Sequence, residues 1–469
     1  MIWLVGAGPG DAGLLTLRGR EVLGRADVVI YDHLVGEGIL AMIPESAERI
    51  DAAKYVGNHT LPQREIEALM IARAREGKNV VRLKGGDPYV FGRGGEEAEA
   101  IICAGLAFEV VPGVSSALAV PACAGIPATH RDYCSGVSIF TAHDKDNLLP
   151  DFTDTTQIFL MGVGNAGALQ ERLLMTLPPD TPCTVIQDGT TSRQHVVRTA
   201  LSGLVRTIHE NSITPPAVIV VGRTASLNLN WRANLPLNGR RILITRPAGR
   251  ADKLSSTLRD LGAEVIHLPT IETHTLHGSL EGVELDGYDW AGFTSVTGVN
   301  TLFGLLAETR RDIRELGGAK IAAIGPATAG ALREHGLKVS YVPEVYDGGH
   351  LAGGLAELGG SVLMFRALEG SPEIADTFTK YGIRNQQVCI YRTDYVKLFH
   401  VPDFTDTIIF TSASTVRGFC CSVSTMRDVK AVCIGYQTAE EALRQGFACT
   451  VIAEQATVDA LADAVLSCS

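Results

Sequence analysis

Short runs of β-branched residues alternate with amphipathic helical patterns along almost the whole chain. This alternation favours an α/β protein, because helices then cover the faces of mostly parallel sheets. A stretch of poor periodicity from Ala225 to Gly239, rich in asparagine, predicts a linker between two halves. The residues Pro62–Arg75 predict an amphipathic helix. In the first half we expect strands at Ile2–Val5, Val28–Tyr31, Val80–Leu83, Phe108–Val111, Val137–Thr141, Ile158–Met161, Thr184–Ile186 and Ala217–Val221.

Composition excludes several classes of protein. The chain has 469 residues, of which 46% are hydrophobic and 20% charged, and this is enough to build roughly two to four folded domains. Its net charge of -11 argues against nucleic acid as a partner. No apolar run approaches the ~20 residues of a membrane helix, and the first residues lack the basic start of a signal peptide. We therefore expect a cytoplasmic protein with no membrane partner.

The cysteines indicate neither a metal site nor a disulfide framework. The ten cysteines form no Cys-x-x-Cys pair, and only Cys420 and Cys421 are adjacent. This spacing argues against a zinc ribbon and against a disulfide scaffold. We expect reduced and mostly buried thiols, and no bound metal.

The second half contains an internal repeat, in which several short runs recur in the same order. The runs are Ile242–Arg246, Phe293–Ser295 and Ile324–Ala329 in the first copy, and Val362–Arg366, Phe410–Ser412 and Ile434–Ala439 in the second. Such self-similarity predicts two similar α/β lobes with a ligand-binding cleft between them.

Two glycine-rich loops follow expected strands in the first half. One is Val5–Asp11, and the other, Arg82–Glu97, contains a run of glycines and a proline. Glycines let a backbone approach a ligand closely, and a helix that begins after the loop offers free amide donors. The first loop is similar to a dinucleotide fingerprint, which leaves an NAD-dependent oxidoreductase as an alternative. Asp11, however, stands where the third glycine of that fingerprint belongs.

A third motif, Val111–Ser116, is followed by Gly125–Tyr133. Together with the two loops, and in this order, it resembles the uroporphyrinogen-III C-methyltransferase family of tetrapyrrole methylases over residues 1–232. The resemblance implies two α/β lobes, about 1–112 and 113–232, with S-adenosylmethionine bound between them and S-adenosylhomocysteine as product. It places the donor site at Pro9, Gly85, Gly86, Asp87, Val90, Ser115, Ser116, Met161 and Gly189, the proton acceptor at Asp32 and the proton donor at Lys54.

The chemistry that this resemblance implies suits such residues. An electron-rich pyrrole carbon attacks a sulfonium methyl, and the protein must hold carbon, methyl and sulfur in line. A proton must then be moved, which is a task for Asp32 and Lys54. The substrate carries many carboxylates, so arginines that form paired hydrogen bonds are expected around it. We expect Arg131 to bind them, with Arg82 or Arg93 as further candidates.

The repeated motifs of the second half are similar to the uroporphyrinogen-III synthase family over about residues 240–466, which implies a domain of residues 240–469 after a linker at 233–239. The resemblance implies two flavodoxin-like lobes joined by a short strand ladder. One lobe combines about 240–272 with 396–466, and the other is 273–395. Substrate carboxylates would be held at helix N-termini, by Ser295, Thr328, Ser412 and Thr438. Tyr391 would assist loss of the terminal hydroxyl, and no cofactor is implied.

Together the two resemblances predict a bifunctional enzyme. Its second half would cyclise hydroxymethylbilane to uroporphyrinogen III, and its first half would methylate that product at C2 and C7 to precorrin-2. This product serves sirohaem or cobalamin synthesis. The expected partners are small tetrapyrroles, and the resemblance also implies a homodimer through the methylase half. In one alternative the second half is a binding or regulatory module that lacks synthase activity.

Overall fold

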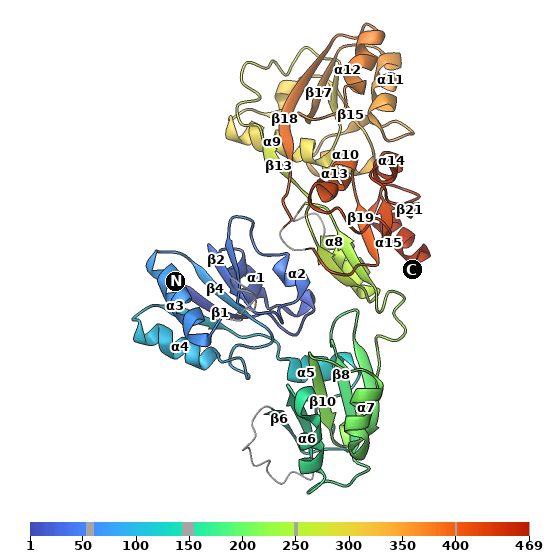
Figure 1. The fold of residues 1–469 in the computed structure, drawn as a ribbon. Coiled ribbons are helices and arrows are strands. Elements are labelled where there is room, and N and C mark those ends of the chain that lie inside the picture. Colours follow the sequence, from blue (N-terminus) through green and yellow to red (C-terminus); the bar gives the residue numbers. More distant parts are fainter. Residues whose placement is uncertain (53–60, 143–153, 248–251, 399–400, 469) are drawn as a thin grey trace.

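The computed structural model describes residues 1–52, 61–142, 154–247, 252–398 and 401–468 (Figure 1). They form four sheets, each covered by helices, so the α/β prediction is confirmed. We refer to the four units as the first to fourth lobes, with sheets at residues 2–111, 136–221, 241–267 plus 407–452, and 271–395. No helix in these described ranges is long and apolar enough to cross a membrane.

The first lobe has a parallel sheet in the order β3-β2-β4-β1-β5. Its central strands β1 and β4 are buried along nearly their whole length, as expected for strands with helices on both faces, and β4 carries two buried cations, Arg82 and Lys84. The carboxyl ends of β2, β4 and β1 therefore lie side by side at one edge. The elements are β1 (Ile2–Gly6), α1 (Leu17–Leu23), β2 (Val28–Tyr31), α2 (Glu37–Leu40), β3 (Glu48–Asp51), α3 (Gln63–Arg75), β4 (Val80–Lys84), α4 (Gly94–Cys103) and β5 (Phe108–Val111).

The second lobe has a mixed sheet in the order β6-β7-β10-β8-β9. Strands β7 and β8 both run antiparallel to β10, so their carboxyl ends lie at the same edge. The elements are α5 (Ser116–Cys123), β6 (Gly136–Thr141), β7 (Thr155–Leu160), α6 (Ala166–Leu173), β8 (Pro182–Gln187), β9 (His195–Ala200), α7 (Leu204–Glu210) and β10 (Ala217–Val221). Every strand expected in the first half of the chain is present, and two further strands, β3 and β9, form sheet edges.

The third lobe joins the start of the C-terminal half to its end, because β11 pairs with β19 and α8 contacts α15 (Figure 1). Its parallel sheet has the order β12-β11-β19-β20-β21. The elements are β11 (Arg241–Ile244), α8 (Asp252–Asp260), β12 (Glu264–His267), β19 (Thr407–Phe410), α13 (Ala413–Ser422), β20 (Lys430–Cys433), α14 (Tyr436–Arg444), β21 (Thr450–Ile452) and α15 (Val458–Ser467).

The fourth lobe has the order β13-β18-β17-β14-β15-β16, and an antiparallel β13–β18 ladder leads to it from the third lobe. Each copy of the sequence repeat contributes to both lobes: the first copy places β11 in the third lobe and β14 in the fourth, and the second places β17 in the fourth lobe and β19 in the third. The elements are β13 (Ile271–Thr275), β14 (Trp290–Phe293), α9 (Val296–Glu308), β15 (Lys320–Ala323), α10 (Pro326–Glu334), β16 (Val339–Tyr341), α11 (Gly348–Leu358), β17 (Val362–Ala367), α12 (Glu373–Lys380) and β18 (Asn385–Tyr395).

The cysteines correct one expectation. All ten thiols are free, but only Cys183 and Cys433 are buried, whereas Cys103, Cys421 and Cys449 are exposed and the others are intermediate. Burial raises the pKa of the Cys183 and Cys433 thiols to about 12. The expectation of mostly buried thiols is therefore wrong, because most of these cysteines lie at the ends of elements rather than in core strands.

The two halves of the chain meet through a chain of hydrogen bonds. Arg241, only 2% exposed, donates from Nη1 to Glu37 of the first lobe at 2.7 Å and from Nη2 to Glu264 at 3.0 Å. Glu264 Oε2 accepts from the backbone N–H and the hydroxyl of Ser192 in the second lobe. The third lobe therefore contacts both lobes that precede it.

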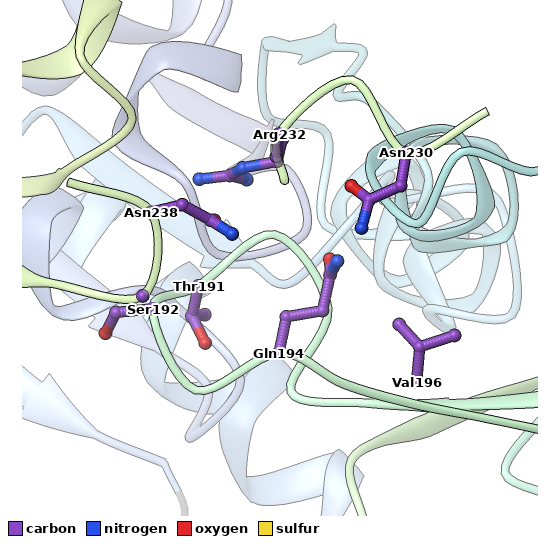
Figure 2. A pocket seen from close by; sticks show the side chains of 8 residues that line it. Thr191, Ser192, Gln194, Val196, Asn230, Arg232 and Asn238 are labelled. Carbon is purple, nitrogen blue, oxygen red and sulfur yellow. The ribbon is translucent and has the colours of Figure 1, made fainter. Parts of the chain in front are cut away.

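The expected linker contains no helix or strand between Leu227 and Arg240. It passes along the second lobe, and Arg232 and Leu237 are its buried side chains. A pocket of about 230 Å³ lies between this linker and residues 191–196 (Figure 2).

Candidate functional site

Glycine loops meet at the carboxyl edge of the first sheet. Gly8 and Gly86 exchange backbone hydrogen bonds of 3.1 and 2.7 Å, which join the loops after β1 and β4. A Cβ atom on Gly113 would stand 2.1 Å from the Gly86 carbonyl oxygen, so only glycine permits this approach. The Asp87 carboxylate fixes the arrangement by accepting from the N–H of Gly113 at 3.0 Å and of Tyr89 at 2.8 Å.

The residues expected to hold the donor lie around these loops. Ser115 caps α5 and Ser116 begins it, so the helix N-terminus faces the loop after β4. A Cβ atom on Gly86 would stand 3.7 Å from the Ser116 nitrogen and would fill the space in front of that amide. Pro9 lies in the loop after β1, and Val90, 36% exposed, lies in the loop after β4.

Two expected donor-site residues come from the second lobe. Met161 follows β7 and Gly189 follows β8, which places both at the same edge of that sheet. Thr190 Oγ1 accepts from the Asp11 N–H at 3.2 Å, so this edge touches the loop after β1. Met161, Asp188 and Thr190 have φ values of 56°, 47° and 75°. Such left-handed backbone is uncommon in residues other than glycine and concentrates at functional sites.

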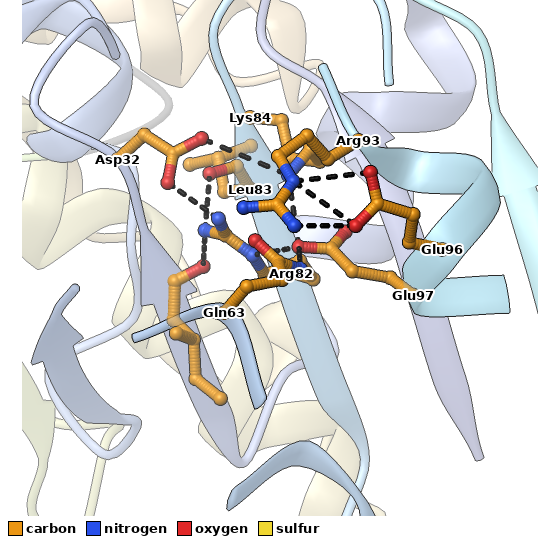
Figure 3. Close-up of polar contacts among 9 residues, drawn as sticks. Asp32, Gln63, Arg82, Leu83, Lys84, Arg93, Glu96 and Glu97 are labelled. Atoms are coloured by element: carbon orange, nitrogen blue, oxygen red, sulfur yellow. Dashed lines mark hydrogen bonds and ion pairs between the residues drawn. The ribbon is translucent and has the colours of Figure 1, made fainter. Parts of the chain in front are cut away.

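Asp32 follows β2 at the same edge of the first sheet, and its side chain belongs to a buried cluster of charges (Figure 3). Arg82 donates from Nη2 to Asp32 and from Nε to Glu97 at 3.0 Å. Lys84 Nζ lies 2.9 Å from Glu97 Oε1 and 3.9 Å from Asp32 Oδ2. Arg82, Lys84 and Glu97 are at most 3% exposed, whereas the Asp32 side chain is 28% exposed. Asp32 is thus the end of the cluster that solvent or a ligand can reach.

The cluster balances two cations against two carboxylates. Burial and the adjacent Arg82 lower the pKa of Lys84. Burial opposes the charge of Arg82 as well, but the carboxylates of Asp32 and Glu97 hold its pKa above the usual value. Charges buried to this degree are tolerated only when they are paired. Each member therefore depends on the others, and Asp32 is held in one orientation.

The sequence motifs did not identify Glu97 as a functional residue. Its Oε1 atom accepts from Gln63, Arg82 and Lys84, and its Oε2 atom is buried with no hydrogen-bond partner among the described residues. A signal was present, because Arg82 and Lys84 are two residues apart on one strand and so face the same side. Two cations on one face of a buried strand require an anion nearby.

The arginines expected to bind substrate carboxylates are dispersed. Arg82 is 2% exposed and pairs with Asp32 and Glu97, and its expected role as a substrate ligand stays a prediction. Arg93 is 56% exposed and pairs with Glu96. Arg131 is exposed in the segment between α5 and β6, and the described residues show no contact between it and the Asp32 cluster. Lys54, the expected proton donor, lies outside the described residues.

In the fourth lobe the structure brings Tyr391 and Ser295 together. Tyr391 lies in β18, is 7% exposed and shares a 2.9 Å hydrogen bond between its hydroxyl and that of Ser295. Ser295 also caps α9 by accepting from the Gly298 N–H at 2.9 Å. The pair therefore lies at a helix N-terminus, where backbone amides favour an anion.

The remaining synthase candidates occupy equivalent positions in the two lobes. Thr328 is the third residue of α10 and Thr438 the third of α14, and they are 4% and 5% exposed. Ser412 caps α13, as Ser295 caps α9. The two copies of the repeat differ after the glycine that precedes the helix: Pro326 follows Gly325 in the first copy, and Tyr436 follows Gly435 in the second. Both glycines nevertheless have the same extended backbone. In each lobe, two helix N-termini thus follow adjacent parallel strands.

Comparisons with known proteins match both halves. A family model for Tetrapyrrole (Corrin/Porphyrin) Methylases matches residues 1–205, and one for Uroporphyrinogen-III synthase HemD matches residues 252–463. The Porphyrin biosynthesis protein HemD of Ruminiclostridium josui is 40% identical, over 99% of this chain and 97% of its own length.

Two further proteins are similar to the first half alone. The S-adenosyl-L-methionine-dependent uroporphyrinogen III methyltransferase of Methanosarcina barkeri is 45% identical, over 48% of this chain and 92% of its own. The crystal structure of uroporphyrin-III-C-methyltransferase from Thermus thermophilus is 40% identical with a TM-score of 0.42, over 48% of this chain and 92% of its own. The chain therefore belongs to the tetrapyrrole methylase family in its N-terminal half and to the uroporphyrinogen-III synthase family in its C-terminal half.

Proposed function

We propose that the chain catalyses two consecutive steps of tetrapyrrole biosynthesis. The C-terminal half cyclises hydroxymethylbilane to uroporphyrinogen III, and the N-terminal half methylates that product at C2 and C7 to precorrin-2. One observation carries the methylase part: β1, β2 and β4 end side by side, and they present the Pro9 loop, Asp32 and the Gly85–Asp87 loop at one edge. The proposal includes a cytoplasmic location, supported by the composition, and a methylase homodimer, supported by the family resemblance.

The glycine loops fit S-adenosylmethionine as the methyl donor. The space in front of Ser116, which a side chain on Gly86 would fill, gives a nucleoside access to backbone amides and carbonyls. When bound, S-adenosylmethionine supplies an electrophilic methyl group to a pyrrole carbon. The loops after β1 and β4 and the edge that carries Met161 and Gly189 would hold and orient it. Correct positioning alone contributes about 7–11 kcal/mol toward a reaction barrier.

Asp32 is proposed to take the proton that the methylated ring must release. Its carboxylate is the exposed end of the buried cluster, and Arg82 and Lys84 fix its orientation from behind. A positioned base of this kind contributes about 10²–10⁴-fold to a rate. Lys54 is proposed to donate a proton in the same reaction, as the family resemblance implies.

In the synthase half, the helix N-termini of the third and fourth lobes are proposed to bind the carboxylates of the linear substrate. Ser295, Thr328, Ser412 and Thr438 add hydroxyl groups at these N-termini. Tyr391 is proposed to protonate the departing hydroxide, with Ser295 orienting its phenol through their shared hydrogen bond. Arg131 is proposed to bind a carboxylate of the methylase substrate, since no carboxylate among the described residues pairs with it.

Titration with S-adenosylhomocysteine tests the donor site. We expect saturable binding by calorimetry, and in Gly86→Val a loss of at least about tenfold, because the new side chain fills the space before Ser116. Gly77→Val is the matched control: Gly77 also has a positive φ, but a Cβ there meets nothing within 4 Å. Equal affinity in Gly86→Val and the control, or saturable binding of NADH instead, would contradict the assignment.

Tyr391→Phe tests the synthase site. We expect the cyclisation rate of the full chain to fall by about 10²-fold, because the variant lacks the proton-donating hydroxyl. Methylation of supplied uroporphyrinogen III should not change, since Tyr391 lies in the fourth lobe. Tyr395→Phe, on the same strand but 49% exposed, should cyclise at the normal rate. If Tyr391→Phe cyclises as fast as the wild type, Tyr391 has no part in the chemistry.

A further inference from the structure

The pocket beside the linker contains a buried arginine, Arg232, that has no carboxylate partner among the residues that the structure describes. Arg232 is 8% exposed, and its Nε atom is buried with no hydrogen-bond partner among the described residues. The thiol of Cys123 lies against the guanidinium, and burial raises its pKa while Arg232 opposes that rise. By contrast, the buried Arg82 and Arg241 each bind two carboxylates. No ion pair joins Arg232 to a carboxylate among the described residues, so its guanidinium can pair with an anion that enters the pocket.

We propose that this pocket binds a carboxylate group, with Arg232 as its anchor. In Figure 2 the side chains of Asn230 and Asn238 project from the linker toward the space above Gln194, and the Arg232 guanidinium lies above Asn238 in this view. The two asparagines are exposed, and their amides make no hydrogen bond among the described residues. They therefore offer further donors to a ligand that the guanidinium attracts.

The opposite wall of the pocket is fixed. Gln194 accepts from the Thr190 N–H at 2.9 Å and donates to the Cys123 carbonyl at 3.2 Å. The Thr191 hydroxyl donates to the Asp188 carbonyl at 2.7 Å. The Gln194 and Thr191 side chains of this wall already have hydrogen-bond partners, so the binding energy must come from the linker side. That side presents one cation, Arg232, and the two neutral amides of Asn230 and Asn238.

The hydrogen-bond donors that line the pocket favour a carboxylate over a phosphate. A guanidinium pairs with a planar carboxylate through two parallel hydrogen bonds. A phosphate dianion would need a second cation, and Arg232 is the one basic residue among those that line the pocket. The volume of about 230 Å³ exceeds that of a carboxylate, and Val196 supplies an apolar contact for a short aliphatic chain. The chemistry therefore matches a propionate-like group.

The pocket also lies where three parts of the chain meet. Ser192 and Gly239 line it, and Ser192 is bonded to Glu264, which joins the third lobe to the second. A bound carboxylate would come either from a free organic acid or from a tetrapyrrole side chain. The second source rests on the proposed function, in which every substrate and product carries such groups.

Propionate is the probe for this site, and Trp231 is the reporter. The Arg232 guanidinium lies 5.7 Å from the centre of the Trp231 ring, which is 59% exposed. At constant ionic strength we expect propionate to change the fluorescence of the full chain saturably, and Trp231→Phe to remove the change. In Arg232→Gln the affinity should fall at least about tenfold. Arg193→Gln is the matched control, because Arg193 is adjacent in sequence to the pocket wall but faces Asp188.

A second variant keeps the test valid if Arg232→Gln folds poorly. Asn238→Ala removes an exposed amide without a hydrogen-bond partner among the described residues, and it should weaken propionate binding several-fold with an unchanged circular dichroism spectrum. The proposal is overturned if the wild type shows no saturable change, if both Arg232→Gln and Asn238→Ala bind normally, or if inorganic phosphate binds more tightly than propionate.

Equilibrium dialysis with uroporphyrin III distinguishes the two sources. Binding that weakens in Arg232→Gln but not in Arg193→Gln identifies a tetrapyrrole side chain as the ligand. If the wild type, Arg232→Gln and Arg193→Gln bind uroporphyrin III equally, while propionate still changes the fluorescence of the wild type, the ligand of the pocket is a free organic acid. If the wild-type chain makes precorrin-2 but shows no saturable fluorescence change with propionate, the proposed carboxylate site is wrong and the proposed function stands. A chain that binds propionate but forms no methylated product retains the site and loses the proposed function.

Discussion

Asp32→Asn is expected to lower the rate of methylation by about 10²–10⁴-fold while leaving the affinity for S-adenosylhomocysteine unchanged. The variant keeps the shape of the side chain but cannot accept a proton at neutral pH. Its effect should appear in turnover rather than in binding of the methyl donor, because among the described residues the Asp32 side chain contacts Arg82 and Lys84 and not the glycine loops. Methylation assays with supplied uroporphyrinogen III, paired with calorimetric titration, measure the two quantities separately.

The control for this prediction lies at the other end of the same strand. Asp27 is exposed just before β2, and its carboxylate accepts from the Asn79 N–H at 2.7 Å. Asp27→Asn keeps an oxygen that can accept this bond, so its turnover should equal that of the wild type. If Asp32→Asn also turned over normally, Asp32 would be a member of a structural cluster with no part in the reaction.

Glu97→Gln is expected to destabilise the first lobe by about 3–5 kcal/mol, the usual cost of removing one charge from a buried ion pair. The variant leaves Arg82 and Lys84, both at most 3% exposed, with Asp32 as their one remaining carboxylate in the part of the chain that the structure describes. Methylation should slow as well, because Arg82 would no longer be held against Asp32. Hydrogen exchange of the β1 and β4 amides in urea follows this lobe separately from the other three.

The neighbouring residue gives a matched comparison for Glu97. Glu96 is also in the first turn of α4, but its side chain is 53% exposed and pairs with Arg93 at the surface. Exposed pairs contribute little to stability, so Glu96→Gln should leave the exchange rates of β1 and β4 unchanged. Equal effects of Glu96→Gln and Glu97→Gln on these exchange rates would show that the buried cluster stabilises the first lobe no more than a surface pair does.

The sequence predicted the strands that are apolar and missed those that are not. The buried parallel strands β1 and β2 are nearly continuous apolar runs and β4 begins with two valines, so their sequence patterns are enough to predict them. β3 has the sequence Glu-Arg-Ile-Asp and a single buried residue, Ile50. β9 contains no fully buried residue. Both are edge strands, which need an apolar face on one side at most, and charged or polar residues interrupt their apolar pattern.

The candidate site was predictable where a motif follows one strand and not where the fold joins distant elements. The glycines of the Gly85–Gly95 loop indicate close backbone contact by themselves. The sequence around Glu97 does not indicate its role, because that role depends on the side chains of Arg82 and Lys84, which reach α4 from the neighbouring strand β4. Arg232 is similar, since nothing in the linker sequence shows that its side chain is buried against the second lobe. Side-chain burial of a charge is a property of the tertiary fold.

The most direct test of the account is to supply the intact chain with hydroxymethylbilane and S-adenosylmethionine and to identify the product by mass and isomer type. We expect a dimethylated type III product, because the synthase half forms the isomer that the methylase half accepts. Accumulation of the unmethylated type I isomer, which forms without catalysis, would contradict the synthase assignment. Unmethylated type III product would instead contradict the methylase assignment.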